Sequence, residues 1–351
     1  MHLQPKTILL LLPVLLLLAC GPSQTATEGQ KEINLTDEEY APGRQLVSQD
    51  GSFDEIVAPD TEIEVLAEGF DWTEGPVWIP EAEYLLFTDI PPNSIFKWKE
   101  DEGKSLYLTP SGYTGEAGRG GEKGANGLIL SPEGRLVLCQ HGDRRVAMMD
   151  APLESPAANY VTLAGTFEGK RFNSPNDATF HSNGDLYFTD PPYGLEKNMD
   201  DPAKEIPFQG VYIRRTDGTV ELLTDGMSRP NGIAFSPDEQ TLYVANSDPK
   251  QAIWMAFDLD ENGKIASKRI LFDATDQVGP ENKGLPDGLK VRQDGIIFAT
   301  GPGGVWVFNP EGQHLGTIRT GQATSNCALG NGDEYLYLTA DMYLMRVRLA
   351  G

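Results

Sequence analysis

The segment RFNSPNDATFHSNGDLYFTDPPYGL, residues 171–195, has the pattern of a β-hairpin. Alternating apolar residues predict one strand at 178–180 and a second strand that ends at Asp190, with a turn at Ser182-Asn183-Gly184 between them. Two polar residues, Asn176-Asp177, stand where the first strand should begin. Five further segments of the chain share this plan, which indicates a repeated structural unit.

Each repeated unit starts with a polar residue, continues as an apolar strand and returns after a short turn. The first residues of the units are Glu74, Asn126, Asn176, Asn231, Asp287 and Asn326. Strand-rich repeats of about 50 residues, without an amphipathic helix, are typical of a β-propeller. We therefore predict an all-β fold, a six-bladed β-propeller with four-stranded blades. The last unit has room for three strands, so the N-terminal segment 62–67 is expected to supply the fourth and close the ring.

All six first residues carry a side-chain oxygen. The innermost strand of every blade lines the central channel, so these equivalent positions are expected to point toward one axis. Carboxylate and amide oxygens suit a hard cation such as Ca²⁺, and Glu74 and Asp287 would supply the compensating negative charge. Asn-Gly and Asp-Gly are also common turn sequences. That alternative explains the Asn and Asp units well and Glu74-Gly75-Pro76 poorly.

Several motifs occur in order and at the spacing of the blades. They are Glu74-Gly75-Pro76-Val77-Trp78, Ser174-Pro175-Asn176-Asp177, Tyr187-Phe188-Thr189-Asp190-Pro191-Pro192-Tyr193-Gly194, Arg229-Pro230-Asn231-Gly232 and Pro286-Asp287-Gly288. Together they resemble the gluconolactonase, senescence-marker-protein and luciferin-regenerating-enzyme family, over residues 74–349. The resemblance implies a propeller that hydrolyses lactones and related esters with a divalent cation in its channel. It implies Glu74, Asn176, Asn231 and Asp287 as the metal ligands.

Ca²⁺ is the expected ion, with Mg²⁺, Mn²⁺ or Zn²⁺ as alternatives at an oxygen-rich site. A cation there would polarise the lactone carbonyl and acidify a water, and Asp287 is the expected catalytic residue, as general base or as nucleophile. Asn126, Arg171 and Tyr193 are expected to bind the substrate. For Asn126 and Asn326, a water or a second structural cation is the alternative. Tyr193 and the loop 194–209 would form a wall or lid of the site, or merely an ordered rim.

Other functions remain open. The family is similar to diisopropyl fluorophosphatase in fold and ligand set, so the same site could hydrolyse phosphotriesters or aryl esters. A propeller that only binds a partner is the alternative from a different class. The chain has no Gly-x-Ser-x-Gly elbow. His141 could act as a base, but a structural histidine at a strand end is the favoured interpretation.

Residues 1–20 have the pattern of a bacterial lipoprotein signal peptide, with an apolar run too short to span a bilayer and a terminal Cys20. A plain secretory signal is the alternative. We expect a flexible acidic tether at residues 21–55 and the hydrolase propeller at residues 56–351. The predicted protein is a monomeric, exported lipoprotein, anchored to the membrane at Cys20 and facing the periplasm from the outer membrane, or lying at the cell surface.

The charge of the chain argues against nucleic acid as a partner. It has 28 basic and 52 acidic residues and a formal net charge of −24, which repels a phosphate backbone.

The chain has two cysteines after Cys20, Cys139 and Cys327. Both lie in apolar, strand-like segments, so two buried unpaired thiols are expected, with one disulfide as the alternative.

Overall fold

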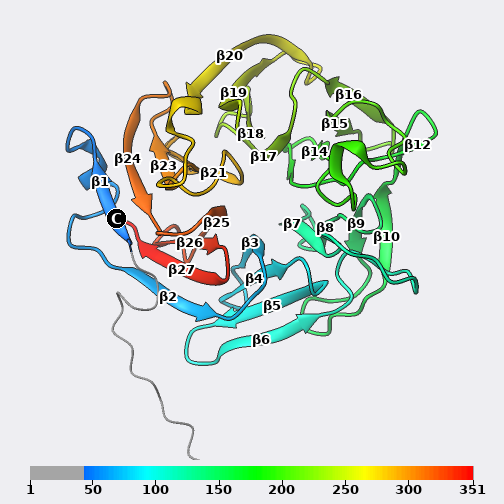
Figure 1. Cartoon of the computed structure of the whole chain (residues 1–351), viewed down its shortest axis with the longest axis horizontal. Coiled ribbons are helices and arrows are strands. Elements are labelled where there is room, and N and C mark those ends of the chain that lie inside the picture. The colour runs from blue at the N-terminus through cyan, green and yellow to red at the C-terminus, as the bar shows by residue number, and fades with distance from the viewer. Residues whose placement is uncertain (1–42, 351) are drawn as a thin grey trace, which may run out of the picture. The chain divides into compact units, whose positions relative to one another are not determined.

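The strands assemble into six antiparallel sheets around a central axis (Figure 1). The computed structural model describes residues 43–350, which fall within one unit of the chain, Thr36–Gly351. Each sheet is one blade, and its strands follow one another from the axis outward. The prediction of an all-β, six-bladed propeller is confirmed.

Blades 1 to 3 each contain four consecutive strands. Blade 1 is β3 (Thr73–Ile79), β4 (Tyr84–Asp89), β5 (Ser94–Lys99) and β6 (Gly103–Leu108). Blade 2 is β7 (Ala125–Leu130), β8 (Leu136–Gln140), β9 (Arg145–Met149) and β10 (Tyr160–Ala164). Blade 3 is β13 (Ala178–Phe180), β14 (Leu186–Asp190), β15 (Gly210–Arg214) and β16 (Val220–Thr224). The hairpin predicted from residues 171–195 is thus the inner half of blade 3.

Blades 4 to 6 complete the ring. Blade 4 is β17 (Pro230–Phe235), β18 (Thr241–Asp248), β19 (Gln251–Leu259) and β20 (Ile265–Asp273). Blade 5 has β21 (Leu289–Val291), β22 (Ile297–Gly301), β23 (Gly304–Phe308) and β24 (His314–Arg319). Blade 6 has β25 (Thr324–Gly330), β26 (Tyr335–Ala340) and β27 (Tyr343–Arg348). Short elements between and before the blades are β11 (Thr166–Phe167), β12 (Lys170–Arg171), and the 3₁₀ turns η1 (Ser52–Glu55), η2 (Asn198–Asp200) and η3 (Thr275–Gln277).

The two ends of the described chain meet in blade 6. β2 (Ile63–Glu68) pairs antiparallel with β27 and becomes the outer, fourth strand of this blade. At the inner strands, Ser325 Oγ donates to the Thr73 carbonyl of blade 1 at 2.6 Å. The predicted closure of the ring by an N-terminal strand is confirmed.

The prediction that residues 21–55 form a tether is wrong for its last part. β1 (Gln45–Ser48) pairs with β24 and gives blade 5 a fifth strand. Phe53, in η1, is only 1% exposed and packs in the core between blades 5 and 6 with Ile56 and Val57. These few apolar residues lie in an acidic segment without strand periodicity, which is why the sequence pattern did not reveal them. The proposed signal peptide and Cys20 lie outside the described residues.

The core lies between the blades. Six clusters of buried hydrophobic side chains fill the six gaps between neighbouring sheets. In β4, Leu85 packs toward blade 6 and Leu86 packs toward blade 2. Successive residues of a strand face opposite sides of the sheet, so a strand buried on both sides is apolar throughout. Cys139 and Cys327 lie in two different gaps as buried free thiols, as predicted.

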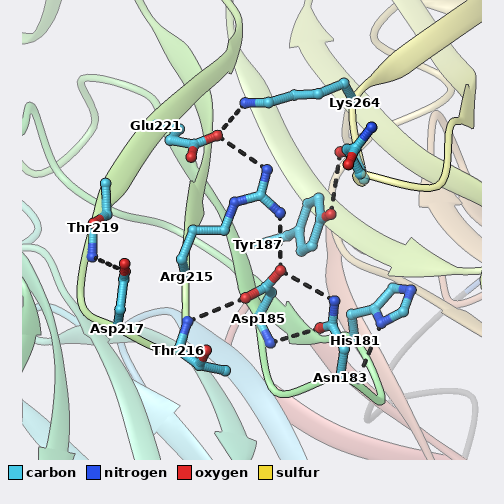
Figure 2. Close-up of polar contacts among 12 residues, drawn as sticks. His181, Asn183, Asp185, Tyr187, Arg215, Thr216, Asp217, Thr219, Glu221 and Lys264 are labelled. Atoms are coloured by element: carbon cyan, nitrogen blue, oxygen red, sulfur yellow. Dashed lines mark hydrogen bonds and ion pairs between the residues drawn. The ribbon is translucent and has the colours of Figure 1, made fainter.

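The turn after β13 is held by charged side chains of blades 3 and 4. Arg215 donates to Asp185 at 2.9 Å and to Glu221 at 3.0 Å, and Glu221 also pairs with Lys264 of blade 4 (Figure 2). The Thr216 backbone N–H donates to the same Asp185. This network fixes the turn between β13 and β14, at the opposite end of the hairpin from Asn176.

No helix within residues 43–350 is long and apolar enough to cross a membrane.

Candidate functional site

The first residue of each repeated unit, here called the opening residue of its blade, lies where the strand pairing is irregular. In blades 1, 2, 4 and 6 the register between the first two strands shifts at or directly beside the opening residue. In blades 3 and 5 the ladder starts only after that residue, at Ala178 and Leu289. A bulge releases a residue from the alternation of the strand and redirects its side chain. The six opening side chains thus leave the pattern of the sheet at the same place in every blade.

Glycines follow four of the six opening residues, where neighbouring blades approach closely. Gly75 has a φ of +45°, and a Cβ on it would lie 2.0 Å from the Asn126 carbonyl oxygen of blade 2. A Cβ on Gly288 would lie 2.0 Å from the Asn326 side chain of blade 6. At both positions the glycine is required by crowding near the axis, and not by a hairpin turn. Turn statistics alone do not explain these two glycines.

A cavity of about 220 Å³ opens at this end of the channel. Its lining includes six of the seven residues that the sequence predicted for the site: Glu74, Asn126, Asn176, Tyr193, Asn231 and Asp287. The remaining lining residues are Trp72, Glu122, Arg229, Ser247, Gly284, Leu285 and Thr324. Residues more than 200 positions apart in the sequence, such as Glu74 and Asp287, therefore share one cavity.

Several buried oxygens in this cavity have no partner. Asn126 Oδ1, Asn176 Oδ1 and Asp287 Oδ1 make no hydrogen bond within residues 43–350. Glu74 is 2% exposed, and its Oε2 accepts from the Gly75 backbone N–H at 2.9 Å and from Asn326 Nδ2 at 3.1 Å. A buried polar atom without a partner costs free energy, so such a group calls for a ligand. Unpartnered carboxylate and amide oxygens fit a hard cation such as Ca²⁺.

The carboxylates of Glu74 and Asp287 in the cavity repel one another. Burial raises the pKa of both Glu74 and Asp287, and the charge of Glu74 raises that of Asp287 further. Glu122 and Asp177 add to the rise in the Asp287 pKa. A divalent cation would relieve this repulsion. No group of three or more His, Cys, Asp and Glu within residues 43–350 is placed to hold a metal ion, so any cation here needs amide oxygens as well.

Two acidic residues at strand ends hold the turns that lead into the cavity. Asp190, at the end of β14, accepts from the Asn173 N–H at 2.8 Å and from the Ser174 N–H at 2.7 Å. This contact fixes the backbone two residues before Asn176. In blade 1, Asp89 accepts from the Trp72 N–H at 2.9 Å in the same way. Both carboxylates position residues that line the cavity.

Arg171 is the one predicted site residue that the cavity excludes. It lies in β12 and is exposed, and its guanidinium donates to the Asp143 carbonyl at 3.1 Å. The prediction that Arg171 binds substrate is not supported, because closeness in sequence to Asn176 does not set the direction of its side chain. Asn326, another opening residue, also lies outside the lining and instead donates to Glu74.

Tyr193 forms a wall of the cavity. Its hydroxyl donates to the Ser247 carbonyl of blade 4 at 3.2 Å, and burial raises its pKa. The loop 194–209 supplies no lining residue and meets the loop before β7 instead, where the Gly120 N–H donates to Glu196 at 3.3 Å. Of the two interpretations of that loop, an ordered rim therefore agrees better with the structure than a wall.

Glu122 and Arg229 are lining residues that the sequence did not reveal. Neither belongs to the repeated unit, since Glu122 lies in the loop before β7 and Arg229 in the turn before β17. Arg229 stands two residues before Asn231, in the motif Arg229-Pro230-Asn231-Gly232, and this proximity was the available signal.

The fold and cavity together define a class, the six-bladed propellers with an oxygen-rich site in the channel. The model of the family "SMP-30/Gluconolactonase/LRE-like region" matches residues 72–341. The chain belongs to this family. It is 39% identical over 300 residues to a gluconolactonase of Zymomonas mobilis, a match that covers 84% of this chain and 83% of that protein. It is 26% identical over 278 residues to the pentonolactonase XacC of Haloferax volcanii, covering 76% and 80% of the two chains.

Solved structures agree with this placement. A gluconolactonase of Xanthomonas campestris matches with a TM-score of 0.74 at 30% identity, covering 88% of this chain and 96% of that one. A calcium-binding regucalcin of Agrobacterium tumefaciens matches with a TM-score of 0.64 at 18% identity, covering 83% and 95%, which shows the shared fold. The named relatives include enzymes that open lactones, which are cyclic esters.

Proposed function

We propose that this chain is a metal-dependent lactone hydrolase with its active site in the channel cavity. The observation that carries the proposal is the pair of carboxylates in one cavity, Glu74, which is 2% exposed, and Asp287, whose Oδ1 is enclosed and unpartnered. They lie beside the unpartnered amide oxygens of Asn126 and Asn176. A propeller that only binds a partner has no need to bury two carboxylates in one cavity. The identity to gluconolactonases over most of the chain supports the same conclusion.

Glu74, Asn176, Asn231 and Asp287 would hold the cation, for which Ca²⁺ fits the oxygen ligands best. When bound, the cation supplies Lewis acidity toward the lactone carbonyl and lowers the pKa of a water. The chain supplies the proton transfer. Asp287 Oδ1 has no hydrogen-bond donor within residues 43–350, so this oxygen is free to accept a proton from the attacking water.

Asp287 can alternatively attack the carbonyl directly, which would give a covalent acyl intermediate. Mass spectrometry of the chain trapped during turnover in ¹⁸O-labelled water distinguishes the two routes. A nucleophilic Asp287 incorporates ¹⁸O into its own carboxylate, whereas a general base leaves the label in the product.

The test of the proposed function is a hydrolysis assay with a panel of small lactones and a paraoxon-type phosphotriester, before and after chelation. We expect lactone hydrolysis that is lost with chelator and restored with Ca²⁺. Asp287→Asn keeps the shape of the side chain but removes the base, and should lower kcat by about 10²- to 10⁴-fold. Preference for the phosphotriester would move the function to the alternative substrate class. Activity that survives chelation, or unchanged activity of Asp287→Asn, would refute the proposed site.

We also propose that Cys20 carries a lipid that tethers the exported chain to a membrane. The proposal is supported by the apolar run that ends in Leu17-Leu18-Ala19-Cys20. Metabolic labelling with a palmitate analogue, compared between the natural chain and Cys20→Ala, tests it. Equal labelling of the two chains would contradict the tether.

A further inference from the structure

Two charged side chains of the cavity have no part in the mechanism above. Glu122 lies in the loop between β6 and β7, at the start of blade 2. Arg229 lies in the turn between β16 and β17, at the start of blade 4. Tyr193 of blade 3 lines the same cavity. The cavity thus holds one hydrogen-bond acceptor and one donor of opposite charge, on elements far apart in the sequence.

The backbone of Arg229 is held firmly, while its guanidinium makes no hydrogen bond within the described residues and its charge acts on the nearby Asp248 carboxylate. The Arg229 N–H donates to Asn246 Oδ1 at 2.8 Å, and its carbonyl accepts from the Ser247 N–H at 2.9 Å. The guanidinium makes no hydrogen bond or ion pair with any residue in the range 43–350. A guanidinium presents five N–H donors in a planar fork. A guanidinium on a fixed backbone, with its N–H donors unpaired in a cavity, suits a ligand that has several hydrogen-bond acceptors.

Glu122 lies beside a buried histidine. His141 is completely buried, neither of its ring nitrogens has hydrogen-bond geometry to any atom of the described chain, and Nδ1 lies 3.3 Å from Glu122 Oε2. The loop that carries Glu122 is fixed by Arg119, which donates to the Gly142 carbonyl at 2.8 Å and to the Gly194 carbonyl. The Glu122 side chain is 37% exposed and lines the cavity, so its carboxylate is accessible to a ligand.

We propose that Glu122 and Arg229 form a pair that recognises the hydroxyl groups of a polyhydroxylated lactone. The inference rests on the proposed lactone hydrolysis and adds to it two residues that select the hydroxylated substrate. A sugar hydroxyl both donates and accepts, so a carboxylate can take the proton of one hydroxyl in a hydrogen bond while a guanidinium donates to the oxygen of another. A lactone without hydroxyls leaves both charged groups unpaired in the cavity.

The Glu122 side chain is 37% exposed, so water partly solvates it without a ligand, and the preference comes mainly from the charged hydrogen bonds that a hydroxylated substrate adds. Each of the two contacts is expected to contribute about 10- to 100-fold to kcat/KM for the hydroxylated substrate. The ring carbonyl is the same in both substrates. Removal of either side chain should therefore lower the ratio of kcat/KM for the hydroxylated lactone to kcat/KM for the unsubstituted one. Any effect of the Glu122 charge on Asp287 acts on both substrates and cancels in this ratio.

The experiment compares glucono-1,5-lactone with δ-valerolactone, which has the same six-membered ring and no hydroxyls. The full chain, loaded with Ca²⁺, is assayed by a pH indicator in mildly acidic buffer, with the spontaneous opening subtracted. The variants are Glu122→Gln and Arg229→Met. Two control variants make the same charge changes at exposed positions outside the cavity: Glu116→Gln in the same loop as Glu122, and Lys250→Met in blade 4.

We expect Glu122→Gln and Arg229→Met to lower the ratio of kcat/KM on glucono-1,5-lactone to kcat/KM on δ-valerolactone by about 10- to 100-fold. The control variants should match the natural chain on both. Equal losses on the two substrates, or no loss on either, would overturn the pair while leaving the proposed hydrolase intact. No hydrolysis of either lactone by the natural chain would instead overturn the proposed function, and the pair with it. Near-UV circular dichroism of each variant verifies that it is folded.

Discussion

The substitution Asp190→Asn tests how the turn before Asn176 is held. Burial raises the pKa of Asp190 to about 7, even though two backbone N–H groups donate to its carboxylate. The unfolded chain would titrate this group near its ordinary value of 3.8. The difference between the two pKa values corresponds to about 4 kcal/mol of pH-dependent stability.

The sign follows from which state binds the proton. Between pH 3.8 and about 7 the folded chain keeps the proton on Asp190 and the unfolded chain has lost it. The stabilising contribution is therefore complete below pH 3.8 and is lost as the pH rises through about 7. The amide side chain introduced by Asp190→Asn does not titrate, so this pH dependence should disappear in the variant. The amide also replaces one of two acceptors with a donor, which should cost about 1–3 kcal/mol at neutral pH.

The assay is equilibrium urea unfolding, followed by tryptophan fluorescence, at a series of pH values from 4 to 8. The quantity of interest is the difference in unfolding free energy between the natural chain and Asp190→Asn at each pH. Asp200→Asn, at an exposed carboxylate in η2, is the matched control and should show no trend. A difference that stays constant across this pH range would refute the reasoning, because Asp190 would then titrate alike in the folded and unfolded chains.

Ca²⁺ added to the chelated chain should raise the midpoint of thermal unfolding, because saturation to 100 times Kd stabilises the folded state by about 2.7 kcal/mol. Calorimetry measures this, and a midpoint independent of calcium would contradict the site. Gly288→Ala should impair lactone turnover, since its Cβ would lie 2.0 Å from the Asn326 side chain that donates to Glu74. Kinetics compare it with Gly118→Ala, where no atom lies within 4 Å of the added Cβ. Phe53→Ala should destabilise the fold by about 3–5 kcal/mol in urea unfolding. A loss below about 1 kcal/mol would show that η1 is not part of the core.

The positions of the six opening residues could be predicted because each blade repeats the same local sequence pattern. Every inner strand has to run from a polar axis into an apolar gap, so a polar residue precedes an apolar run six times. Glu74, Asn176, Asn231 and Asp287 were found by that pattern and by the motifs around them, and all four line the cavity. The cations and roles assigned to them remain predictions.

Residues outside the repeat were predicted poorly. Arg171 was included for its place beside the blade 3 motif, yet its side chain binds the Asp143 carbonyl at the surface. Glu122 and Arg229 were missed, because loops between blades differ in length and sequence from one blade to the next. Phe53 was missed because a single aromatic residue in an acidic segment has no periodicity that would indicate its burial.

The sequence alone therefore determined the six-bladed ring, its closure by an N-terminal strand and the polar residues at its axis. These features follow from local patterns, since strand alternation and turn residues act over a few positions and repeat along the chain. Only the tertiary structure decided which loop residues face the cavity. Loop conformations depend on contacts between blades, such as those of Arg119 with the carbonyls of Gly142 and Gly194, and such contacts join positions that no local pattern relates.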